Sequence, residues 1–99
     1  MFYPLHVEFE WDSKKNQDNL EKHGVDFYSA QLAFLDQYRI ISKDILHSTE
    51  SEERFFCFGL IPEGIITVRF TLRANNIRIF GAGFWREGKK IYEKQNKLL

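Results

Sequence analysis

Three strand-like segments follow one another between residues 54 and 81 with only short turns between them. Residues 54–60, 65–73 and 77–81 are rich in β-branched and aromatic side chains, which favour strands. Pro62-Glu63-Gly64 and Ala74-Asn75-Asn76 separate these segments and are typical turn sequences. Connections this short join neighbouring antiparallel strands, so the sequence predicts an antiparallel meander.

The N-terminal part predicts a short strand followed by an unusually polar helix. Residues 5–11 alternate as a strand does, and residues 12–23 form the helix. Asp12 is a good N-cap, and Gly24 supplies the left-handed residue that commonly ends a helix. Leu20 is the one aliphatic side chain between these caps. A helix without an apolar stripe is not an ordinary core helix, so its polar side chains are candidates for function.

The remaining elements complete an α+β domain. Asp26 is a candidate cap for a second, amphipathic helix that ends near residue 35, and residues 38–42 predict a short edge strand. Residues 82–99 predict a C-terminal helix. The expected order is βααβ(βββ)α in one domain of 99 residues, with an antiparallel sheet that has the helices on one face. The other face would be open for binding.

The composition fits a globular protein of the cytoplasm. The apolar fraction is 43%, and no apolar run approaches the roughly 20 residues that span a bilayer. The N-terminus lacks the basic and apolar regions of a secretory signal. Cys57 is the single cysteine, which fits a reducing compartment, and its apolar surroundings predict a core residue. We therefore expect a cytoplasmic protein with no membrane association.

Charge is distributed unevenly along a chain whose net charge is zero. Residues 1–53 carry 5 Lys or Arg against 11 Asp or Glu, whereas residues 54–99 carry 9 against 3. The folded surface would then have one basic and one acidic face, or the two halves would interleave and cancel. Composition favours neither interpretation.

Arginines recur on one side of the three central strands. Within residues 65–73, apolar side chains alternate with Thr67, Arg69, Thr71 and Arg73. The neighbouring strands add Arg54 and Arg78. The planar guanidinium suits phosphate, so the four arginines predict a surface that follows a nucleic-acid backbone. The alternative is a solvated face, or arginines paired with the acidic first half of the chain.

Several motifs resemble the BrnT-type toxin family. Its N-terminal signature is matched by Phe9, Glu10, Trp11, Asp12, Lys15, Asn19, Lys22, His23, Gly24, Val25 and Phe27. Further matches are His47-Ser48 followed by E-E-R-F around Glu53 and Arg54, T-x-R ending at Arg73, I-R-I centred on Arg78, and Tyr92-Glu93. The resemblance runs from about residue 8 to residue 94.

The resemblance implies a RelE-like microbial ribonuclease fold and a type II toxin that cleaves RNA without a metal or other cofactor. It also implies a ribbon-helix-helix antitoxin as partner, and a heterotetramer with an antitoxin dimer is one candidate assembly. In such chemistry the RNA 2′-hydroxyl attacks the adjacent phosphate. A base removes its proton, cations stabilise the oxyanion and an acid protonates the leaving oxygen.

Four residues are the candidates for this catalysis: His23, Glu53, Arg73 and Arg78. The candidates for RNA contact are Lys15, Lys22, Arg54, Arg69, Trp85, Arg86, Lys89 and Tyr92. Three of these candidates, His23, Glu53 and Tyr92, also have a structural alternative. His23 could instead stabilise a helix C-terminus, and Glu53 could simply form an ion pair with an arginine. Tyr92 could be the core-facing residue of an amphipathic helix. The three histidines show no metal-ligand spacing, so no metal site is expected.

One departure from the family pattern bears on activity. After I-R-I many members continue S-A-R, whereas Gly83 stands at the position of that arginine. Arg86 and the nearby lysines keep basic charge, but at other positions. Two other functions are therefore alternatives to a ribonuclease toxin. One is a catalytically silent relative that binds the antitoxin, its operon or RNA, and the other is a single-strand RNA-binding module.

Overall fold

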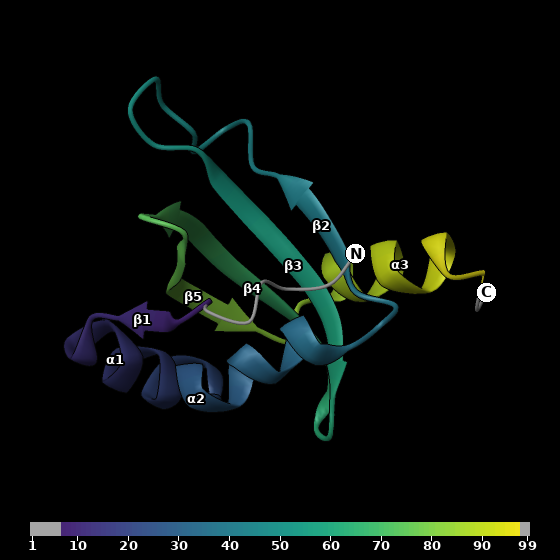
Figure 1. The fold of residues 1–99 in the computed structure, drawn as a ribbon. Coiled ribbons are helices and arrows are strands. Elements are labelled where there is room, and N and C mark those ends of the chain that lie inside the picture. The colour runs from purple at the N-terminus through teal and green to yellow at the C-terminus, as the bar shows by residue number, and fades with distance from the viewer. Residues whose placement is uncertain (1–6, 98–99) are drawn as a thin grey trace.

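Five strands form one sheet in the order β1-β5-β4-β3-β2 (Figure 1). In this computed structural model, which describes residues 7–97, the elements are β1 (Phe9–Trp11), α1 (Ser13–His23), α2 (Phe27–Ala30), the 3₁₀ helix η1 (Gln31–Leu35), β2 (Ile40–Lys43), β3 (Arg54–Ile61), β4 (Gly64–Arg73), β5 (Asn76–Gly83) and α3 (Arg86–Gln95). The predicted α+β class is confirmed. The first two residues of the predicted N-terminal strand and the last two of the C-terminal helix lie outside the described range.

Strands β3, β4 and β5 form the predicted antiparallel meander. In the β4–β5 turn, Ala74 and Asn75 have φ angles of 51° and 69°. Two consecutive positive φ angles are typical of a type I′ turn, whose twist matches that of the flanking strands. Strand β2 pairs with the outer side of β3, as an edge strand, at residues 40–43.

The N-terminal strand pairs with β5 in parallel, so the prediction of an antiparallel sheet is wrong at this edge. Phe9 lies opposite Ile77 and Trp11 lies opposite Ile79. Most of the chain separates β1 from β5 in sequence, so no hairpin turn fixes their relative direction. Only three residues of β1 pair, which makes the strand shorter than predicted.

The predicted helix caps are confirmed. Asp12 Oδ2 accepts a hydrogen bond of 2.9 Å from the Lys15 amide, and Gly24 ends α1 with a φ of 71°. Asp26 Oδ1 accepts one of 2.8 Å from the Ser29 amide at the start of α2. The second helix is a single α-helical turn that tightens into η1, so it is less regular than its apolar spacing predicts.

Buried polar contacts attach α1 to the sheet. Asn19 Nδ2 donates to the carbonyl oxygens of Val25 at 2.8 Å and Ala82 at 2.9 Å, and Asn19 Oδ1 accepts from the Ala82 amide at 3.1 Å. The Asn19 side chain thus satisfies both backbone groups of a fully buried β5 residue. These hydrogen bonds attach α1 to the sheet in place of the apolar stripe that the helix lacks.

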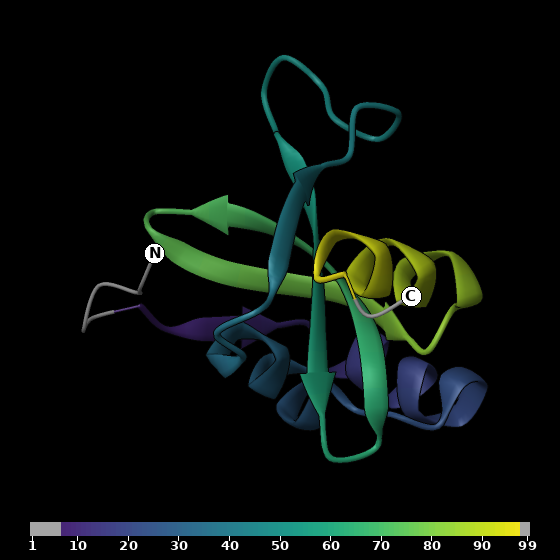
Figure 2. The ribbon, with the colours of Figure 1, turned by 90° about the vertical axis from the view of Figure 1, so that its right-hand side faces the viewer.

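Helix α3 differs from the prediction in its start and its position. It begins at Arg86 because residues up to Gly83 still pair with β4. It packs on the sheet face opposite α1 and α2, so the prediction that all helices share one face is wrong (Figure 2). Gly88 makes this packing possible, since a Cβ there would collide with Thr67 Oγ1 and lie 2.9 Å from the Phe58 ring.

The core lies between the sheet and the N-terminal helices. Phe34 is its centre, with its ring edge-on to Phe9 at 5.4 Å and to Phe70 at 5.0 Å between centroids. Trp11 packs edge-on against Phe27 at 6.1 Å, as expected for a core role. Cys57 is fully buried, and burial raises the pKa of its thiol to about 12, which confirms it as a core residue.

Candidate functional site

Four arginines lie together on the sheet face that α1 and α2 do not cover. Arg54 of β3, Thr71 of β4 and Arg78 of β5 stand opposite one another in the ladders, so their side chains share this face. Arg69 and Arg73 lie two positions either side of Thr71 on β4. We call Arg54, Arg69, Arg73 and Arg78 the arginine face.

Two carboxylates from the first half of the chain pair with this face. Glu10 Oε2 lies 2.8 Å from Arg78 Nη1. Glu52 bridges two arginines, at 2.8 Å from Arg54 Nε and 3.5 Å from Arg73 Nη2. The hydrogen bond from Arg78 lowers the pKa of Glu10, and the one from Arg54 lowers the pKa of Glu52. The acidic first half and the basic second half of the sequence therefore interleave on this face. Its four guanidiniums are accompanied by two carboxylates.

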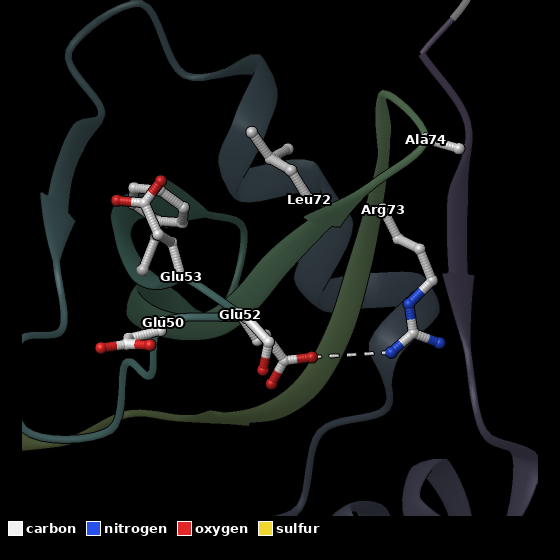
Figure 3. A pocket seen from close by; sticks show the side chains of 8 residues that line it. Glu50, Glu52, Glu53, Leu72, Arg73 and Ala74 are labelled. Atoms are coloured by element: carbon white, nitrogen blue, oxygen red, sulfur yellow. Dashed lines mark ion pairs between the residues drawn. The ribbon is translucent and has the colours of Figure 1, made fainter.

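An open hollow of about 520 Å³ lies at the end of β4 beside Arg73 (Figure 3). Glu53 and Arg73 line it together, from opposite sides of the view, with Glu52 between them and paired to Arg73. Its lining residues are Glu50, Ser51, Glu52, Glu53, Phe55, Leu72, Arg73 and Ala74. The structure thus brings together Glu53 and Arg73, two of the predicted catalytic residues.

The Glu53 side chain also has a structural partner. Lys43 Nζ lies 2.9 Å from Glu53 Oε2, and both side chains are at least half exposed. The backbone carbonyl of Glu53 accepts a hydrogen bond of 2.6 Å from Thr71 Oγ1, in the middle of the arginine face. The backbone position of Glu53 is therefore fixed against β4, while its carboxylate stays within reach of the hollow.

The structure does not bring His23 to the arginine face. Its ring packs edge-on against Trp85, with 5.3 Å between ring centroids, where the end of α1 meets the start of α3. Trp85 follows the far end of β5, and the five residue steps from Arg78 to Gly83 alone span about 17 Å. Lys22, Arg86 and Lys89 are exposed on the same two helix ends. We call this group the helix corner: Lys22, His23, Trp85, Arg86 and Lys89.

Two further candidates lie outside both groups. Lys15 is exposed in the first turn of α1. Tyr92 is 3% exposed, and its hydroxyl donates a hydrogen bond of 2.5 Å to Asp36 Oδ2. Burial first, and then the Asp36 carboxylate, raise the pKa of Tyr92 above its ordinary value. Tyr92 is a core residue here, without a surface on which RNA could stack.

Sequence reasoning missed three residues that contact the arginine face. Glu10 and Glu52 hold the guanidiniums, and Phe80 lies beneath two of them. Glu10 was visible as the polar member of an alternating strand, but only the β1–β5 pairing places it next to Arg78. Alternation places Phe80 on the same face as Arg78, but only the fold brings side chains from β3 and β4 over its ring.

Within residues 7–97, no three His, Cys, Asp or Glu side chains converge as metal ligands would. In the same range, no helix has the length and apolar character needed to cross a membrane.

A sequence model of the family described as "Ribonuclease toxin, BrnT, of type II toxin-antitoxin system" matches residues 11–88. The match covers more than three quarters of the chain. The chain belongs to the BrnT toxin family. Among curated proteins no significant match is found. Membership in a type II system implies an antitoxin protein as partner. The matched range includes the whole arginine face and every residue of the helix corner except Lys89.

The Trp85 ring of the helix corner packs directly on the backbone of Gly83. A Cβ on Gly83 would lie 2.6 Å from Trp85 Cζ2 and 2.7 Å from Cε2, so the indole ring fills the space above the backbone there. Gly83 is itself buried. The indole ring therefore occupies the space that a side chain at position 83 would need.

We expect Gly83 and Trp85 to be energetically coupled. Gly83→Ala should lower the free energy of unfolding by about 1–3 kcal/mol, because the new Cβ overlaps the indole ring. In a Trp85→Ala background the same substitution should cost much less, since the ring is gone. Urea unfolding of the wild type, the two single variants and the double variant measures the coupling. Equal costs in both backgrounds would show that the ring does not require glycine.

Proposed function

We propose that this protein is a metal-independent endoribonuclease, the toxin of a type II toxin–antitoxin system, acting at the arginine face. The observation that carries the proposal is that Arg73 and Glu53 line one open hollow, with Arg78 on the strand next to Arg73. Strands β4 and β5 fix the two arginines, and such rigid positioning is what stabilisation of a developing oxyanion requires. Family membership supplies the reaction class, and the site supplies residues with suitable chemistry.

In this proposal an RNA phosphate binds between Arg73 and Arg78. The Glu53 carboxylate removes the proton from the 2′-hydroxyl of the preceding nucleotide, whose oxygen then attacks the phosphorus. The bond to the 5′-oxygen of the next nucleotide breaks, and that oxygen takes a proton from solvent in the open hollow. The two guanidiniums hold the negative charge that builds up on the phosphate oxygens.

Glu10 and Glu52 keep the arginines in place while no RNA is bound. Their lowered pKa values keep both carboxylates ionised at neutral pH, so they act as acceptors and not as general acids. Each carboxylate contact uses one nitrogen of a guanidinium, whereas an incoming phosphate can contact two and would displace it. Both pairs are partly exposed, so this exchange needs no change of fold.

We assign the helix corner to contact with flanking RNA. The aromatic rings of His23 and Trp85 lie beside three exposed cations. Single-stranded RNA could stack its bases on the rings while its phosphates contact the cations. The distance along β5 argues against proton transfer by His23 at the arginine face. Lys15 would add a phosphate contact on α1.

We further propose the finer features that the family resemblance suggests. These are a RelE-like fold, a cytoplasmic location and a ribbon-helix-helix antitoxin that forms a heterotetramer with two toxin chains. An antitoxin that covers the arginine face would have to supply acidic side chains, because the arginines outnumber their carboxylates.

Expression of the protein alone in a bacterial host tests the proposal. We expect growth arrest and new RNA ends, detected by primer extension, and both should disappear on co-expression of the antitoxin encoded beside it. The soluble variant Arg73→Ala is the matched control and should permit normal growth.

Gly83 supports one rival function. If the family's arginine takes part in cleavage, its replacement by the Gly83–Trp85 packing leaves a silent protein that still binds its antitoxin or RNA. Normal growth and intact cellular RNA, with soluble folded protein, would favour this rival over the ribonuclease.

A further inference from the structure

The ring of Phe80 lies against two guanidiniums from two other strands. Arg54 Cζ is 4.4 Å from the centre of the Phe80 ring, and Arg69 Cζ is 5.4 Å from it. Both distances fall within the range of cation–π attraction. We call these three side chains, from β3, β4 and β5, the Phe80 stack.

Alternation along β5 places Phe80 on the arginine face, two positions after Arg78. Arg69 pairs with Gly81 and Phe70 pairs with Ile79, so Phe80 has no partner on β4 and forms a bulge. The bulge keeps Gly81 on the same face, opposite Arg69, and bulges are frequent next to functional sites. Ile79 points into the core and is 1% exposed, whereas Phe80 turns to the arginine face and stays partly exposed.

Gly81 contributes space for the same arrangement. A Cβ on Gly81 would lie 3.4 Å from Arg69 Cδ, so a larger residue would press on the side chain that crosses toward Phe80. The glycine, the bulge and the two arginines come from three strands and converge on one ring. That ring is on the opposite side of the sheet from the core, so packing of the core does not account for it.

The stack leaves planar surfaces available. Glu52 binds Arg54 through Nε, in the plane of the guanidinium, and does not cover its faces. One face of this guanidinium lies over Phe80, and the Arg54 side chain is 33% exposed. Aromatic rings and guanidinium planes are the surfaces on which unpaired bases stack in single-stranded RNA.

We propose that the Phe80 stack is a nucleobase subsite that holds one unpaired base of single-stranded RNA next to the phosphate site of Arg73 and Arg78. This inference rests on the proposed RNA-binding function. It adds a place where a base stacks, which contacts between arginines and phosphates alone would not provide. Stacking is tolerant of base identity, so the subsite selects unpaired RNA and not a particular base.

The test is equilibrium binding of purified protein to a short single-stranded RNA by fluorescence anisotropy. The RNA carries 2′-O-methyl groups, which prevent cleavage, and a matched series has one abasic nucleotide moved along the strand. We expect Phe80→Leu to weaken binding to the intact RNA about tenfold, which corresponds to about 1.4 kcal/mol. One abasic position should weaken binding to the wild type by a similar factor and should leave the variant unaffected.

Tyr28→Leu is the matched control, because Tyr28 is an exposed aromatic residue of α2, on the other side of the sheet. Thermal unfolding should show that Phe80→Leu remains folded. Salt-dependent binding that is the same for wild type and Phe80→Leu, with no sensitive abasic position, would overturn the subsite while leaving the phosphate contacts intact. Absence of any RNA binding by the wild type would overturn the proposed function and the subsite together.

Discussion

Replacing Arg78 by alanine is expected to lower the rate of RNA cleavage by about two to three orders of magnitude, as loss of one oxyanion-stabilising donor does in other enzymes. Arg73→Ala should have an effect of the same order. In our proposal both guanidiniums bind the phosphate more strongly in the transition state than in the ground state. The single-turnover rate with excess purified protein measures this directly.

The fold should survive both substitutions. The side chains of Arg73 and Arg78 are partly exposed, at 57% and 29%, and their carboxylate partners reach solvent. Lys94→Ala, an exposed cation of α3 outside both proposed RNA contacts, should cleave at the wild-type rate. Arg78→Lys separates charge from geometry, because lysine keeps the charge but loses the planar fork. Full activity of both alanine variants would remove the arginine face from the mechanism.

Replacing Asn19 by alanine should destabilise the protein more than any surface change on α1. Three backbone partners lose their hydrogen bonds: the carbonyl oxygens of Val25 and Ala82 and the amide of Ala82. Each buried group left unpaired costs about 1–3 kcal/mol, so the three together should cost at least about 3 kcal/mol. A domain of this size is stabilised by only about 5–15 kcal/mol, so the loss is severe.

Urea unfolding at neutral pH measures this loss. Gln17→Ala is the control on the same helix, because Gln17 is exposed and its one side-chain hydrogen bond joins it to Glu21. It should change the free energy of unfolding by less than about 0.5 kcal/mol. Nearly equal stability of the Asn19→Ala and Gln17→Ala proteins would show that α1 is not held by the buried amide.

Local patterns were enough to predict most individual elements. The caps Asp12, Gly24 and Asp26 act within a few residues of their own position, so their sequence signals carry over directly into structure. The same holds for the meander, because short turns leave few ways to connect its strands. Alternation along β4 likewise separates the arginines from the core side chains.

Features that depend on distant partners were not predictable in this way. The parallel pairing of β1 joins residues more than sixty positions apart, and it alone places Glu10 beside Arg78. The position of α3 depends on the contact of Gly88 with Thr67 and Phe58, which no periodicity reveals. The bulge at Phe80 is a mismatch between two strands, not a property of either one.

The separation of His23 from Arg78 shows the same limit for the candidate site. Both residues lie in the range that matches the BrnT family, yet the fold places them at opposite ends of β5. Residue type suggested that His23 transfers a proton, whereas its place beside Trp85 suggests contact with RNA.

The chemical identity of the cleaved RNA ends tests the central claim most directly. Purified protein is incubated with a single-stranded RNA in excess EDTA, and the products are analysed by mass spectrometry. Attack by the 2′-hydroxyl predicts a 2′,3′-cyclic phosphate on one fragment and a free 5′-hydroxyl on the other, with both absent for Arg78→Ala. Fragments with 5′-phosphates, cleavage that requires a divalent cation, or RNA that stays intact would contradict the account.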